Sequence, residues 1–219
     1  VSDCRELVKR SAKIYGQKIA FKFKRDGKLI EKTYIDFDRE IDALGTALYS
    51  LGLNGSYISV IAENRYEWGV SYFSIINGTG VGVPLDKYLP ANEVENLVSR
   101  GRVEAIFYSQ TYQDMMVEFS KKETTLKYYI CMDDIELPDD SRFLSMSSLT
   151  RKGTELVEQG DKSFIDANID REEMSILLFT SGTTMASKGV MLSHKNIASN
   201  VSSVSALMEV YPTDVHLSL

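Results

Sequence analysis

Cysteine, proline, tryptophan and histidine are scarce in this chain of 219 residues, which has two, four, one and two of them. Two cysteines cannot build a disulfide framework, and the separation of Cys4 from Cys131 matches no zinc-ligand spacing. The two histidines, His194 and His216, lie in no metal-binding pattern. These shortages argue against a disulfide-stapled secreted domain and a zinc protein, and they favour a reducing, cytoplasmic setting.

The chain also lacks a long uninterrupted apolar run. Its most apolar stretch, residues 68–85, is interrupted by Asn77, Gly78, Gly80, Gly82 and Pro84, so it falls short of the roughly 20 apolar residues that span a membrane. Basic charge is not in excess either, because 31 acidic residues against 25 basic ones give a net charge of −6. We expect no transmembrane segment and no nucleic-acid partner, whereas peripheral membrane contact is compatible with this composition.

What remains is an ordinary folded composition, with 43% hydrophobic and 26% charged residues. The length fits one large domain. Because the chain begins at Val1 rather than methionine and stops at residues 216–219, which resemble the start of another apolar strand, we expect residues 1–219 to be the incomplete N-terminal part of a larger domain.

Hydrophobic periodicity predicts an α/β fold. Residues 19–35 alternate around an Asp26-Gly27 pair and predict a β-hairpin, and residues 36–51 have the period of an amphipathic helix ended by Gly52. Strands and helices then alternate, which predicts a mostly parallel, doubly wound sheet flanked by helices. The expected strands are 57–62, 81–84, 105–108, 128–132 and 176–179, and the expected helices include 66–76 and one opening at Asn92 with Glu95 in a capping box.

Three further sequence features predict structural roles rather than functional ones. The polar residues 133–168 read as a surface excursion around a short helix at 148–158. The glycine-rich residues 78–82 leave a helix and enter a strand, which is the wrong order for a dinucleotide fingerprint and favours tight packing instead. Ser193 is placed as a helix N-cap, so His194 reads as a surface imidazole in the first turn.

The most informative segment is residues 180–189, Thr-Ser-Gly-Thr-Thr-Met-Ala-Ser-Lys-Gly, which we call the phosphate loop. Hydroxyls and backbone N–H groups can donate to phosphate oxygens, glycine permits close approach, and a lysine supplies compact positive charge. It is not a Walker A loop, because its lysine precedes Gly189 and a strand-like run follows. A Ser/Thr-rich hairpin turn explains the composition equally well.

The longer string Phe179-Thr-Ser-Gly-Thr-Thr-Met-Ala-Ser-Lys-Gly-Val-Met-Leu-Ser-His194 resembles the signature of the adenylate-forming superfamily, which includes acyl-CoA synthetases. The segments 61–68 and 83–90 resemble upstream parts of its long-chain fatty acid members. This resemblance implies ATP-dependent conversion of a carboxylic acid, with a long-chain fatty acid as the expected substrate, into an acyl-adenylate, followed by transfer of the acyl group to coenzyme A.

The resemblance also assigns roles to residues. Lys188 is implied as the catalytic residue, and Thr180 as the residue that contacts Mg²⁺. The residues implied to hold the β- and γ-phosphates of ATP are Thr180, Ser181, Gly182, Thr183, Thr184, Lys188 and Gly189. The family often has glycine in place of Met185 and proline in place of Ser187, so we expect a reshaped loop with negative φ at Met185.

Other parts of the family's site, including its acid pocket and the adenylation lysine, would lie beyond Leu219, so we expect this chain alone to be inactive. Alternatives are an enzyme that activates an aryl or amino acid, a noncatalytic nucleotide-binding scaffold, and an unrelated phosphate-binding enzyme. The last is weakened because the chain has no Walker A, GxSxG or kinase catalytic-loop pattern.

Overall fold

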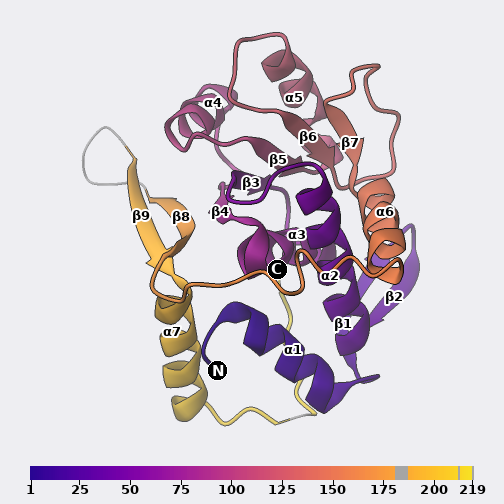
Figure 1. The fold of residues 1–219 in the computed structure, drawn as a ribbon, viewed down its shortest axis with the longest axis vertical. Coiled ribbons are helices and arrows are strands. Elements are labelled where there is room, and N and C mark those ends of the chain that lie inside the picture. Colours follow the sequence, from indigo (N-terminus) through magenta and orange to yellow (C-terminus); the bar gives the residue numbers. More distant parts are fainter. Residues whose placement is uncertain (181–186, 212, 219) are drawn as a thin grey trace.

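A seven-stranded sheet organises the computed structural model, which describes residues 1–180, 187–211 and 213–218 (Figure 1). The strand order is β7-β6-β5-β3-β4-β8-β9, and every neighbouring pair is parallel except β8 and β9. The strands are β3 (Tyr57–Ile61), β4 (Val81–Pro84), β5 (Ala105–Tyr108), β6 (Tyr128–Cys131), β7 (Phe143–Ser145), β8 (Met174–Thr180) and β9 (Lys188–Ser193). The predicted mostly parallel sheet is therefore confirmed.

The predicted hairpin forms a separate two-stranded sheet of β1 (Ile19–Arg25) and β2 (Lys28–Thr33). Asp26 and Gly27 at its tip have φ values of 50° and 74°. Positive φ at both central residues is the geometry of the tight turns that match strand twist, and aspartate and glycine adopt it most readily. The Asp-Gly pair thus sets the register of the hairpin.

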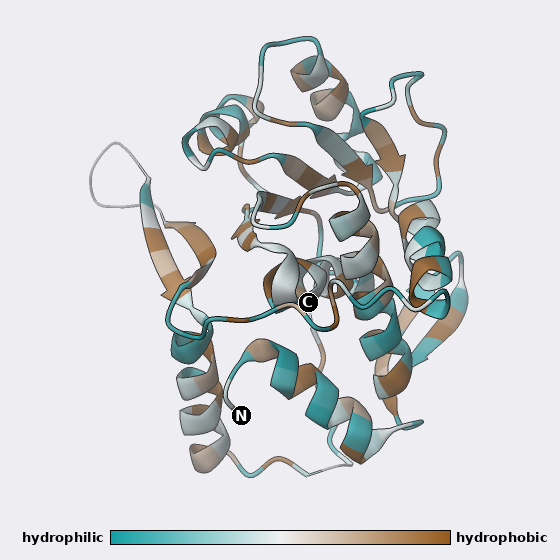
Figure 2. Cartoon of the chain, viewed as in Figure 1, coloured by the Kyte–Doolittle hydropathy of each residue, from teal (hydrophilic) through white to brown (hydrophobic). Residues whose placement is uncertain are grey.

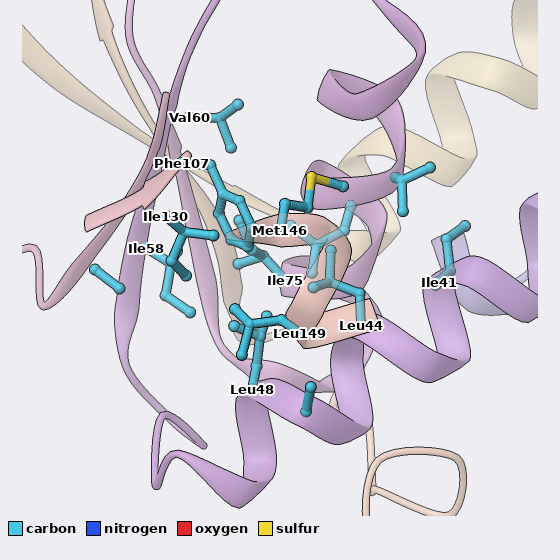
Figure 3. Close-up of a cluster of buried hydrophobic side chains, with 14 of the residues drawn as sticks. Ile41, Leu44, Leu48, Ile58, Val60, Ile75, Phe107, Ile130, Met146 and Leu149 are labelled. Atoms are coloured by element: carbon cyan, nitrogen blue, oxygen red, sulfur yellow. The ribbon is translucent and has the colours of Figure 1, made fainter. Parts of the chain in front are cut away.

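Helices cover both faces of the large sheet. They are α1 (Cys4–Tyr15), α2 (Tyr34–Ser50), α3 (Tyr66–Ser74) with a π-helical turn at Ile75–Thr79, α4 (Ala91–Arg100), a 3₁₀ turn at Gln110–Tyr112, α5 (Gln113–Ser120), α6 (Met146–Glu158) and α7 (His194–Leu207). On one face, α2, α3 and α6 pack over Ile58, Val60 and Phe107 (Figure 3). On the other face, α4 and α5 pack over Ile61 and Tyr108. This is the doubly wound arrangement expected from the alternation.

Buried apolar side chains dominate both layers. The strands are mostly brown in Figure 2, whereas many of the connecting loops are teal. Burial on both faces explains why the central strands β3, β5 and β6 read as continuous apolar runs rather than alternating ones. Across the described ranges, no helix is both long and apolar enough to cross a bilayer.

Two sequence expectations about local structure are wrong. The helix expected at Asn92 begins at Ala91 with Pro90 as its N-cap, which has no side-chain capping bond. Glu95 forms no capping box and instead pairs with Lys122 at 2.6 Å. Pro90 has no side-chain acceptor, so the N-cap side chain cannot accept a hydrogen bond from the backbone N–H groups of the first turn.

Residues 133–168 are not a surface excursion. They contribute β7, which extends the sheet beside β6, and α6, which packs along α2. Phe164 from the same stretch is only 1% exposed. The polarity of the segment concealed this because α6 buries only one narrow stripe, including Met146, Leu149 and Gly153.

The glycines at 78–82 serve close packing, as the sequence indicated. A Cβ on Gly80 would lie 2.1 Å from the Ser56 carbonyl oxygen, and one on Gly78, whose φ is 134°, would lie 2.4 Å from Arg5 Nη2. Only glycine fits at either position. The predicted helix end at Gly52 is also confirmed, with a φ of 73°.

Candidate active site

The candidate site lies where β8 ends, among the carboxyl ends of parallel strands. β8 runs parallel to β4, with Ile176 opposite Gly82. In open α/β sheets ligands bind outside the carboxyl ends of the strands. Thr180, the last residue of β8, is therefore delivered to the edge of the sheet at which a nucleotide would be expected.

The β8–β9 hairpin brings the two ends of the phosphate loop together. In its antiparallel ladder Thr180 lies opposite Lys188, and Phe179 lies opposite Gly189. Thr180 and Lys188 are both exposed, and the hairpin projects from one side of the molecule (Figure 1). A hydroxyl and an ammonium group thus stand at the same end of one hairpin, although the residues are eight positions apart in sequence.

The remaining predicted loop residues lie outside the described residues. These are Ser181, Gly182, Thr183 and Thr184, together with Met185, whose expected negative φ stays a prediction. Gly189 is described and is closely packed, since a Cβ there would lie 3.0 Å from Leu177 Cδ1. Its lack of a side chain keeps that face of β9 close to β8.

Helix α4 contacts the hairpin at Ser187, directly before Lys188. Arg100 Nη2 donates to the Ser187 carbonyl oxygen at 2.8 Å, and the Ser187 hydroxyl donates to Glu93 Oε1 at 3.2 Å. The Arg100 guanidinium carbon also lies 5.6 Å from the centre of the Phe179 ring. Sequence reasoning missed Glu93 and Arg100, because an acid and a base seven residues apart on a helix face are too common to signal a contact.

Lys188 is suited to meet an anion. Among the described residues, none forms an ion pair with it. By contrast, Lys195 at the start of α7 pairs with Glu172 at 2.8 Å. An exposed ammonium without a partner keeps its charge available for phosphate oxygens.

His194 is a correction to the sequence interpretation. It is only 2% exposed rather than a surface imidazole. Its Nδ1 accepts the backbone N–H of Cys4 at 3.3 Å, so the proton resides on Nε2, which donates to the Ile76 carbonyl oxygen at 3.0 Å. Burial lowers its pKa, which stabilises the neutral ring. His194 therefore ties α7 to α1 and has no free nitrogen for chemistry.

The cysteines are equally unsuited to catalysis. Both are buried and unpaired. Burial, reinforced by the neighbouring charge of Asp3, raises the pKa of the Cys4 thiol to about 11. Since the thiolate is the reactive form, Cys4 acts as a small apolar side chain.

The described residues do not form a binding site for a permanently bound metal ion. Within residues 1–180, 187–211 and 213–218, no three carboxylate, histidine or cysteine side chains gather closely enough to hold an ion. The Thr180 hydroxyl is compatible with Mg²⁺ that arrives already bound to a nucleotide, because Mg²⁺ takes most ligands from water and phosphates.

Comparison with known proteins shows the family of this chain. A model of the family described as AMP-binding enzyme matches residues 8–219. Among curated proteins, the chain is 24% identical over 188 residues to the crotonobetaine/carnitine–CoA ligase of Escherichia fergusonii, covering 85% of this chain and 35% of that protein. It is 28% identical over 190 residues to the peroxisomal long chain acyl-CoA synthetase 7 of Arabidopsis thaliana, covering 85% and 27%.

The fold matches solved structures as well. The anthranilate CoA ligase AuaEII, crystallised in complex with anthranoyl-AMP, superimposes with a TM-score of 0.77 at 22% identity. The match covers 93% of this chain and 37% of that one. The chain therefore spans about a third of the length of the relatives it matches.

Proposed function

The chain belongs to the AMP-binding enzyme family, and we propose that it supplies the phosphate-binding part of a carboxylic acid–CoA ligase. In the proposed reaction the carboxylate attacks the α-phosphorus of ATP, an acyl-adenylate forms and pyrophosphate leaves. Coenzyme A then takes the acyl group as a thioester and AMP is released. The observation that carries the proposal is the pairing of Thr180 with Lys188 at the carboxyl end of β8.

The proposed chemistry depends on positioning and charge rather than on a covalent protein intermediate. As the oxygen–phosphorus bond to the leaving group breaks, negative charge accumulates on pyrophosphate. A cation already aimed at those oxygens stabilises the transition state more than the ground state. We assign this role to Lys188, while the Thr180 hydroxyl contacts the Mg²⁺ that accompanies ATP.

Residues 180–184 and 189 complete the proposed phosphate-binding loop. Ser181, Gly182, Thr183 and Thr184 would offer hydroxyl and backbone N–H donors to the β- and γ-phosphates, and Gly189 would keep the strand close behind them. This assignment rests on the order of residue types in the loop and on the position of its two described ends.

We propose a long-chain fatty acid as the acid substrate. One relative carries the name long chain acyl-CoA synthetase, which supports this choice. An aryl acid is the alternative, supported by a structural neighbour that is an anthranilate CoA ligase. We also propose a cytoplasmic location, since unpaired cysteines are typical of reducing compartments.

We further propose that the complete reaction needs more chain than these 219 residues. The curated relatives are about three times as long as the part that this chain matches. In this proposal residues 1–219 form the first part of a large domain. The acid pocket, the remainder of the nucleotide site and a small mobile domain would be contributed by further sequence.

The proposal is tested by acid-dependent exchange of labelled pyrophosphate into ATP, using the full-length protein that contains this chain. Hexadecanoate, octanoate, benzoate, anthranilate and a mixture of amino acids are compared at equal concentration. We expect exchange with hexadecanoate above all. Exchange with benzoate or anthranilate alone would overturn the fatty acid assignment. ATP binding without exchange in the presence of any of these acids would overturn the ligase proposal and favour a noncatalytic nucleotide-binding scaffold.

A further inference from the structure

One helix face fixes the residue before Lys188 from two sides. Glu93 stands in the first turn of α4 and Arg100 in its last, two turns apart on one face. The Glu93 carboxylate accepts a hydrogen bond from the Ser187 hydroxyl, and the Arg100 guanidinium donates a hydrogen bond to the Ser187 carbonyl oxygen. We call Glu93 and Arg100 the α4 clamp.

The clamp acts on both strands of the hairpin. Arg100 lies over the ring of Phe179 in β8 while it bonds Ser187 at the entrance of β9. Gly101, the next residue, also lies close to Phe179, since a Cβ there would be 3.6 Å from the ring. The clamp therefore fixes the hairpin where Thr180 and Lys188 face each other.

The Ser187 carbonyl belongs to the same planar peptide unit as the Lys188 nitrogen. A bond to that oxygen therefore constrains the rotation of the backbone that carries the lysine. Glu93 is itself held, because its other carboxylate oxygen accepts from Asn96 at 3.3 Å. Its negative charge at the helix N-terminus and the Arg100 charge at the C-terminus both suit the helix dipole.

We propose that Glu93 and Arg100 are positioning residues that hold Lys188 in the orientation required for pyrophosphate release. This inference rests on the proposed function. Serine at position 187 is what makes the contact with Glu93 possible. Proline at this position would restrain the backbone through its ring and would need no acceptor for a hydroxyl.

The test uses Glu93→Ala, Arg100→Ala and their double variant in the full-length protein. The matched control is Glu95→Ala combined with Lys122→Ala, which removes a neighbouring ion pair of 2.6 Å between α4 and the segment that follows α5. Like the double clamp variant, it leaves the net charge unchanged. The assays are pyrophosphate exchange and, separately, thioester formation from supplied acyl-adenylate.

We expect each clamp variant to lower kcat for exchange about tenfold, because small misplacement of a charge at the reacting centre is costly. The KM for the acid and the thioester step should stay within twofold of wild type, as should every parameter of the control. Loss of both half-reactions together, or values equal to those of the control, would overturn a positioning role.

A rescue experiment tests whether Glu93 acts through Ser187. In a Ser187→Pro background, removal of the Glu93 carboxylate should change exchange less than twofold, because the proline ring replaces its restraint. An undiminished loss there would show that Glu93 does not act through Ser187.

Failure of the proposed function and failure of the clamp can be distinguished by hydrogen exchange on the full-length protein. Amides of residues 188–190 should exchange at least fivefold faster in the double clamp variant than in the control. If wild type catalyses no pyrophosphate exchange but this difference appears, the clamp survives and the enzymatic proposal fails. Equal amide exchange in both variants would overturn the clamp whatever the activity.

Discussion

His194 shows how one side chain can connect distant segments of this fold. It begins α7, yet its two ring nitrogens contact the backbone of Cys4 in α1 and of Ile76 after α3. The neutral ring satisfies both partners because one nitrogen accepts and the other donates. Protonation would place a second hydrogen on Nδ1, facing the Cys4 N–H donor.

This geometry predicts a pH-dependent stability. The pKa of His194 is lowered by burial, and the nearby Arg5 charge contributes in the same direction, whereas Asp3 opposes them. The unfolded chain therefore binds a proton near pH 6.5 that the folded chain refuses, so the free energy of unfolding should fall as pH drops below about 6.5. Urea denaturation of the 219-residue chain between pH 7.5 and 5.5 measures this slope.

The His194→Gln variant provides the comparison. It should be less stable at pH 7.5 but should lose less further stability between pH 7.5 and 5.5, because the titrating group is gone. His216, the other histidine, is exposed and serves as the matched site. If His216→Gln flattened the pH dependence instead, the assignment to His194 would be wrong.

At the scale of elements, the contact between α2 and α6 depends on Gly153. A Cβ at this position would lie 1.7 Å from the Ala43 carbonyl oxygen in α2. In an ordinary helix interior, Gly→Ala stabilises by up to about 1 kcal/mol. Here the backbone of one helix lies directly against the other, so any side chain would force the two helices apart.

We expect Gly153→Ala to reduce the free energy of unfolding by about 3 kcal/mol, at the upper end of ordinary overpacking costs. Thr154→Ala, one residue further along and exposed, should be neutral or slightly stabilising. Chemical denaturation of both variants gives the comparison. A Gly153→Ala protein as stable as wild type would mean that α6 does not pack on α2 this closely.

The elements also show which kinds of structure the sequence could predict. The hairpin at Asp26-Gly27, the helix end at Gly52 and the strand–helix alternation are encoded locally, so they were predictable. The capping box at Glu95 was not, because Pro90 begins that helix instead. The packing of residues 133–168 depends on α2, which lies about a hundred residues earlier, and no local pattern reports it.

At the scale of the whole molecule, the candidate site also combines features encoded locally in the sequence with contacts between distant segments. Thr180 and Lys188 could be proposed from sequence because one short segment carries the loop pattern, and their pairing across β8 and β9 is what the structure adds. The α4 contacts at Ser187 bridge about ninety residues of chain and exist only in the folded sheet. Burial of His194 was likewise invisible, since its partners come from α1 and the turn after α3.

The central claim is that Lys188 stabilises the pyrophosphate leaving group, and Lys188→Ala in the full-length protein tests it most directly. Loss of one preorganised donor costs on the order of 3 kcal/mol, so kcat for acyl-adenylate formation should fall about a hundredfold or more. Thioester formation from supplied acyl-adenylate should fall far less, because pyrophosphate has already left.

The matched control is Lys195→Ala, which removes an exposed lysine seven residues further along that pairs with Glu172. The decisive measurement is the ratio of the two half-reaction rates in each folded variant. The account predicts that the rate of acyl-adenylate formation divided by the rate of thioester formation is at least tenfold lower in Lys188→Ala than in wild type, and unchanged in Lys195→Ala. Near-normal adenylation by Lys188→Ala, or equal loss of both half-reactions, would contradict it.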